Sequence, residues 1–85
     1  MAYDIGYTPA ARRQIKKLER ADQERVIEHI DKLSENPRRP GVKKLGGAVN
    51  IYRYRTNDFR IIFEIDDKVP AIFILKVGDR KEVYR

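Results

Sequence analysis

Apolar and polar residues alternate with a period of two in the second half of the chain, a pattern typical of β-strands. Residues 50–55 and 59–65 both alternate in this way, and the polar segment 56–58 between them predicts a tight turn. Residues 71–77 are apolar on both faces, which predicts a third strand in an interior position of the sheet. Together these segments predict a three-stranded antiparallel meander.

The first half of the chain has a helical period instead. Thr8 followed by Pro9 is a strong start signal, because threonine caps a helix and proline fits its first position. We therefore expect a helix over residues 8–20, with its apolar stripe on Ala11, Ile15 and Leu18.

A second helix is predicted from an N-cap at Asp22 to the Asn36–Pro37 pair, which ends it. Its expected buried face consists of Val26, Ile27, Ile30 and Leu33. Few residues separate the two helices, so they should form an antiparallel hairpin.

Residues 2–7 predict a short first strand, and residues 37–47, rich in proline, glycine and basic residues, predict a loop. The expected architecture is a single α+β domain over residues 1–85 with the order β-α-α-β-β-β. An antiparallel sheet would carry the helix hairpin packed on one face.

The alternation also assigns the faces of that sheet. The helices must cover the face that carries Tyr52 and Tyr54, because burying arginines there would be prohibitively costly. Arg53, Arg55 and Arg60 should then project together from the opposite face.

The amino-acid composition indicates which classes of binding partner and which compartment suit this protein. The formal net charge is +6 and the pI is near 9.8, which favours polyanions and nucleic acid first. The absence of cysteine excludes disulfides and thiolate metal sites and suits a reducing compartment. The first residues contain no apolar run typical of a signal or membrane segment, so we expect a cytoplasmic protein that does not associate with membranes.

The predicted order of elements, the loop "KKLGG" and the segments "YRYRTNDFRIIFEI" and "VGDRKEVYR" together resemble the RelE/ParE toxin superfamily, and specifically its RelE-like branch. The resemblance spans essentially the whole chain. It implies the toxin of a type II toxin–antitoxin pair, held inactive by a cognate antitoxin, which we expect to be a small acidic protein. RelE-like toxins cleave mRNA in the ribosomal A site without a metal, so the resemblance implies a ribosome-dependent, metal-independent endoribonuclease with no cofactor.

The resemblance also suggests which residues act. Arg60, Arg80 and Tyr84 match catalytic positions of the family, and Arg53, Arg55 and Lys44 are the expected RNA-binding residues. The chain departs from many relatives at Gly46, which is often basic, and at Asp79, which is often histidine.

The implied reaction is attack by the substrate's own 2′-hydroxyl on the adjacent phosphate. Fixed arginines would stabilise the phosphorane charge, and the Tyr84 ring would stack on an unstacked base. The general base stays open between Tyr84, Glu64 and a mechanism in which the ribosome supplies most of the orientation. We expect His29, the only histidine, to be a partly exposed helix residue without a catalytic role.

Two other functions remain as alternatives. A ParE-like inhibitor of DNA gyrase would share the fold without RNA-cleaving residues, and a non-catalytic basic module could bind RNA or the antitoxin alone. The sequence also predicts that Gly78 lets the chain turn off the last strand, so that Arg80 and Tyr84 lie over the arginine face.

Overall fold

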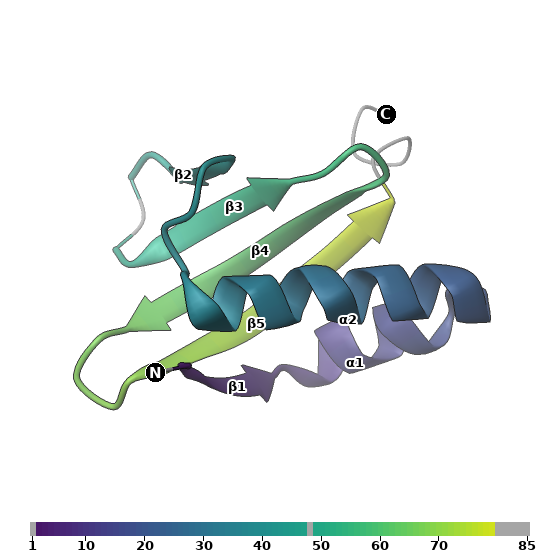
Figure 1. The fold of residues 1–85 in the computed structure, drawn as a ribbon, viewed down its shortest axis with the longest axis horizontal. Coiled ribbons are helices and arrows are strands. Elements are labelled where there is room, and N and C mark those ends of the chain that lie inside the picture. The colour runs from purple at the N-terminus through teal and green to yellow at the C-terminus, as the bar shows by residue number, and fades with distance from the viewer. Residues whose placement is uncertain (1, 48, 80–85) are drawn as a thin grey trace.

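The computed structural model describes residues 2–47 and 49–79, which form two helices and one five-stranded sheet (Figure 1). In chain order the elements are β1 (Asp4–Tyr7), α1 (Pro9–Lys16), α2 (Arg20–Glu35), β2 (Val42–Lys44), β3 (Ile51–Arg55), β4 (Phe59–Asp66) and β5 (Ala71–Asp79). The strand order is β1-β5-β4-β3-β2. The predicted α+β class and meander are confirmed, and β5 is an interior strand as expected.

Two features of the sheet differ from the prediction. Residues 37–47 are not a simple loop, because Val42–Lys44 forms β2 and pairs antiparallel with β3. The sheet is also mixed rather than antiparallel, since β1 pairs parallel with β5. A strand of three residues is too short to show a period, and the neighbour of β1 is decided by contacts between the two ends of the described chain.

The start of α1 follows the prediction. The hydroxyl oxygen of Thr8 accepts a hydrogen bond from the backbone N–H of Ala11 at 3.1 Å, which is an N-cap contact. The same hydroxyl donates to the carbonyl of Leu75 at 2.9 Å. Leu75 is the extra residue of a β-bulge in β5, so the cap of α1 also satisfies a carbonyl that the bulge takes out of the ladder.

The boundary between the helices was predicted wrongly. Helix α1 ends at Lys16, and α2 begins at Arg20 rather than after Asp22. The Gln23 side-chain amide donates to the carbonyls of Lys16 and Leu18 at 3.3 and 3.0 Å, so it satisfies groups left free at the end of α1. Asp22 instead lies in the first turn of α2.

The core lies between the helices and one face of the sheet, as predicted. Its fully buried large side chains are Val26, Ile30, Leu33, Phe59, Ile61, Phe63, Ile65, Ile72 and Ile74. Tyr52 and Tyr54 pack against this cluster from β3. The prediction that Ile27 is buried is wrong: it is 38% exposed, because it follows Val26 by one residue and so points about 100° away around the helix.

The expected turn at Gly78 is also wrong. Strand β5 continues through Gly78 to Asp79, and Gly78 pairs with Arg60 of β4. Because glycine has no side chain, the sheet surface beside Arg60 is left clear on that side.

Candidate functional site

The uncovered face of the sheet carries a cluster of cations in two adjacent rows. Residues directly opposite each other on paired strands point to the same face, with their Cβ atoms about 4.5–5.5 Å apart. One row runs across the sheet through Lys43, Arg53, Ile62 and Lys76, and the next contains Arg55, Arg60 and Gly78. We call this surface the open face. The sequence-based prediction that Arg53, Arg55 and Arg60 share a face is confirmed by this register.

Within these rows, like charges stand directly opposite each other. Arg55 lies opposite Arg60 across β3 and β4, and Lys43 lies opposite Arg53 across β2 and β3. Directly opposed like charges destabilise a sheet by a few tenths of a kcal/mol or more. A bound polyanion would attract both cations and offset their mutual repulsion, so the arrangement favours a negatively charged ligand.

A shallow hollow of about 240 Å³ opens on the same face and is lined by Gly41, Lys43, Arg53 and Arg55. Gly41 has a φ of +98°, which side-chain-bearing residues rarely adopt. A Cβ atom at Gly41 would also lie 3.1 Å from the ring of Tyr54. Glycine is therefore strongly favoured at this point of the lining.

Two carboxylates that flank Arg60 in the sequence are placed away from it. Asp58, in the turn between β3 and β4, pairs with Arg25 of α2 at 2.7 Å. Glu64 is on the open face, but it lies opposite Ile51 and Phe73 and four residues along β4 from Arg60, about 13 Å at strand spacing. Among the described residues, no ion pair joins Glu64 to an arginine.

Lys44 is separated from the other predicted RNA-binding residues. It lies opposite Tyr52, whose side chain packs on the core, so Lys44 belongs to the helix-covered side of the sheet. Its neighbour Lys43 is the residue of β2 that lies on the open face with Arg53. Only the presence of β2 reveals this alternation, so a sequence reading that treats residues 37–47 as a loop misses Lys43.

His29 is on the helix side, as expected, and is partly buried. Its ring makes an edge contact with the ring of Tyr54, with centroids 5.9 Å apart. Burial is the main cause that lowers the pKa of His29, and the nearby Lys32 lowers it further. The neutral imidazole is therefore favoured, and the sheet separates it from the open face.

Arg80 and Tyr84 lie outside the described residues, so their predicted roles stay predictions. Asp79, the last described residue, lies opposite Phe59 at the end of the ladder.

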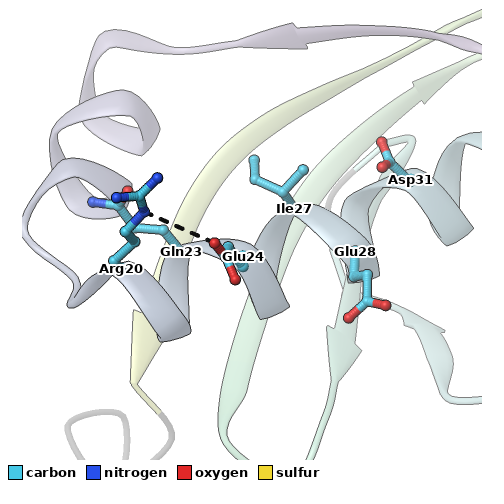
Figure 2. Close-up of a pocket in the computed structure, with 6 residues that line it drawn as sticks. All are labelled: Arg20, Gln23, Glu24, Ile27, Glu28 and Asp31. Carbon is cyan, nitrogen blue, oxygen red and sulfur yellow. Dashed lines mark ion pairs between the residues drawn. The ribbon is translucent and has the colours of Figure 1, made fainter.

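A second hollow lies on α2 and has the opposite charge. It measures about 310 Å³ and is lined by Arg20, Gln23, Glu24, Ile27, Glu28 and Asp31 (Figure 2). Arg20 and Glu24 form an exposed ion pair with N and O atoms 3.9 Å apart. The remaining carboxylates would repel phosphate, so this hollow does not suit a nucleic acid backbone.

Comparison with known proteins decides the family. Residues 5–84 match the family described as the ParE toxin of the type II toxin–antitoxin system parDE. The chain belongs to this family. It is thus a toxin of a type II toxin–antitoxin system, and the predicted membership of the RelE/ParE superfamily is confirmed.

Its relatives include toxins that it matches over most of their length. The toxin is 30% identical to toxin RelG of Mycobacterium tuberculosis, covering 100% of this chain and 99% of the relative. It is 28% identical to a putative RelE-like toxin protein of Escherichia coli, over 99% and 92% of the two chains.

Solved structures show the same fold. The RelBE2 toxin–antitoxin complex of M. tuberculosis gives a TM-score of 0.85 at 29% identity, over 94% of the toxin and 100% of that chain. The RelE–RelB complex of Pyrococcus horikoshii gives 0.79 at 30% identity, over 94% and 97%. The isolated E. coli RelE toxin gives 0.79 at 25% identity, over 98% and 92%.

The described residues lack two further features. None of the helices in that part of the toxin is long and apolar enough to cross a membrane. No group of three or more His, Cys, Asp or Glu side chains there lies close enough together to hold a metal ion.

Proposed function

We propose that the toxin is a ribosome-dependent endoribonuclease that cleaves mRNA through the 2′-hydroxyl of the substrate. The observation that carries the proposal is the Arg55–Arg60 pair on the open face, with Arg53 beside it. Guanidinium groups bind phosphate oxygens in a planar, two-pronged geometry. Three of them on one rigid sheet form a surface that fits a phosphodiester backbone.

The chemistry follows from the charges. The 2′-oxygen attacks the adjacent phosphorus, its bond to the 5′-oxygen breaks, and the products are a 2′,3′-cyclic phosphate and a 5′-hydroxyl. Negative charge grows on the phosphate oxygens in the transition state, where positioned cations stabilise it most. The nucleophile belongs to the substrate, so the reaction requires no metal-bound water. Arg60 is our principal candidate for this stabilisation, together with Arg80 from the family resemblance.

The reaction also requires a general base for the 2′-hydroxyl proton, and the described residues of the open face offer none close to Arg60. Arginine stays protonated near neutral pH, and Glu64 stands about 13 Å along β4 from Arg60. Tyr84, placed by the family resemblance, is the remaining candidate to stack on a base or accept the proton. Orientation of the mRNA by the ribosome would then supply much of the acceleration, and free RNA would be cut very slowly.

We further propose that an acidic antitoxin inhibits the toxin by covering the open face. The similar M. tuberculosis and P. horikoshii structures are complexes of a toxin with its antitoxin. A +6 chain with opposed like charges on an exposed sheet would gain most from a negatively charged partner.

Product analysis tests the proposal. In a reconstituted translation reaction, primer extension should show cuts in ribosome-bound mRNA, and the fragments should carry a 5′-hydroxyl. An mRNA with a 2′-methoxy group at the cleavage position should bind normally and remain intact. Fragments with a 5′-phosphate, or normal cutting of the methoxy substrate, would show that water is the nucleophile instead.

Inhibition of DNA gyrase is the second candidate, because the matching family is described as the ParE toxin. A supercoiling assay with purified gyrase separates the two. Loss of supercoiling at toxin concentrations that leave translation intact would favour the gyrase inhibitor.

A further inference from the structure

Lys43 stands at the edge of the cationic face, and no role has been assigned to it. Strand β2 is the last strand of the sheet, on the opposite edge from β1 (Figure 1). Its register places Lys43 directly opposite Arg53, so the two side chains leave the sheet side by side. Lys43 is exposed, and no ion pair involves it among the described residues.

The hollow beside Lys43 has the composition of an anion site. Three of its four lining residues are cations, Lys43, Arg53 and Arg55, and the fourth is Gly41. Arg60 does not line this hollow, because it extends from β4 on the other side of Arg55.

We infer that Lys43, Arg53 and Arg55 form a subsite for a phosphate of the RNA backbone next to the scissile one. The inference rests on the proposed RNA substrate. It extends the RNA-binding surface from the Arg55–Arg60 pair to the edge strand β2. Neighbouring strands lie about 4.8 Å apart, and Lys43 is two strands and one row away from Arg60, which places it about 12 Å from Arg60 on the sheet. At that distance Lys43 would hold a flanking nucleotide, whereas Arg60 would act on the reacting phosphate.

Lys44 supplies a matched control. Changing either lysine to alanine removes one positive charge from the same strand, but only Lys43 is on the open face. A long-range effect of net charge would weaken both variants equally. A subsite at Lys43 would make Lys43→Ala weaken RNA binding, whereas Lys44→Ala would leave RNA binding nearly unchanged.

The experiment measures binding of a single-stranded RNA with 2′-methoxy groups throughout, which cannot be cut, at 50 and 200 mM salt. Each lost phosphate contact should lower the log–log salt slope by about 0.7 for single-stranded RNA. Over this fourfold range, the affinity of Lys43→Ala should therefore fall about 2.6-fold less than that of the wild type. Lys44→Ala should keep the wild-type slope, and Lys43→Arg should keep both slope and affinity.

On ribosomes, Lys43→Ala should raise the toxin concentration that gives half-maximal cutting and leave the single-turnover rate at saturation unchanged. Equal slopes for Lys43→Ala and Lys44→Ala would overturn the subsite. If Arg53→Ala lowers the slope and Lys43→Ala does not, the subsite is wrong but RNA binding on the open face stands. If neither changes it, both the subsite and the proposed RNA-binding face are wrong.

Discussion

Strands β3 and β4 present two faces built from alternate residues of the same segment. On the helix side, Phe59, Ile61 and Phe63 are at most 2% exposed and pack under α2. On the open face, the intervening positions include Arg55 and Arg60, which oppose each other at the sheet surface. One face is filled with apolar contacts, whereas the other holds like charges close together.

The two faces of this hairpin therefore have different roles: the apolar face stabilises the fold, and the cationic face is the candidate binding surface. Burial of the apolar face removes water from large side chains and stabilises the fold. The cationic face contributes no comparable burial, and it places like charges opposite each other. Changes on the first face should therefore lower the free energy of unfolding, and changes on the second should affect RNA cleavage in a folded protein.

The surface of α2 sharpens the contrast. Its hollow carries Glu24, Glu28 and Asp31 around the exposed side chain of Ile27 (Figure 2). The net charge of +6 is thus not spread evenly over the toxin. Carboxylates line this hollow while cations line the open face, so a polyanion is favoured on the open face over the α2 hollow.

The largest effect on stability should come from Phe63→Ala. This side chain is fully buried and stacks on Tyr52 with ring centroids 6.1 Å apart. Truncating a buried phenylalanine costs about 3–5 kcal/mol, which is a large fraction of the stability expected for a domain of this size. Urea unfolding should show this loss. Ile62→Ala, one residue away on the open face, should cost less, and equal losses would contradict the assignment of the faces.

The largest effect on activity should come from Arg60→Ala. Removing a group that stabilises charge in the transition state should lower the single-turnover cleavage rate about 10²–10³-fold. The free energy of unfolding should change by no more than about 0.5 kcal/mol, because Arg60 is outside the core. Glu28→Gln on the α2 surface is the control and should cut normally. If Glu28→Gln lost as much of the cleavage rate, the loss in Arg60→Ala would not be specific to the open face.

A smaller effect on stability is expected from Gly6→Ala. A Cβ atom at Gly6 would lie 2.7 Å from Cδ1 of Phe73, so the ring would have to move. Overpacking of this kind costs about 1–3 kcal/mol. Adding Phe73→Leu should recover part of the loss, and thermal unfolding of the single and double variants measures the coupling. Strictly additive losses would show that the contact is not responsible.

The smallest effect concerns Asp67 and the pH dependence of stability. Arg38 donates two hydrogen bonds to Asp67, at 3.0 and 2.9 Å, and the Tyr3 hydroxyl donates one at 2.7 Å. The hydrogen bonds from Arg38 and then Tyr3 lower the pKa of Asp67 below its usual value of 3.8. Their contribution is therefore complete above that value and is lost as the pH falls through the lower folded-state pKa.

Asp67→Asn should remove this part of the acid dependence. Its unfolding free energy, followed from pH 6 to pH 2, should fall less steeply than that of the wild type below about pH 4. Asp66→Asn is the neighbouring control, since no ion pair to Asp66 is found among the described residues. Parallel curves for the wild type and Asp67→Asn would exclude the contribution.

Much of this fold could be predicted because the relevant signals are local. The Thr8–Pro9 start of α1 depends on adjacent residues, and the faces of β3 and β4 follow from the period of two. The sequence by itself thus determined that Arg53, Arg55 and Arg60 project together away from the core. Arg80 and Tyr84 were proposed from family resemblance and lie outside the described residues.

Only the tertiary structure decided which residues accompany those arginines. The bulge at Leu75 shifts the alternation of β5, so that Val77 is buried and Lys76 and Gly78 are on the open face. Pairing of the short strand β2 with β3 likewise selects Lys43 over Lys44. Both outcomes depend on hydrogen bonds between segments distant in sequence, and a register change of one residue moves a side chain to the other face. The pattern within one strand therefore could not determine them.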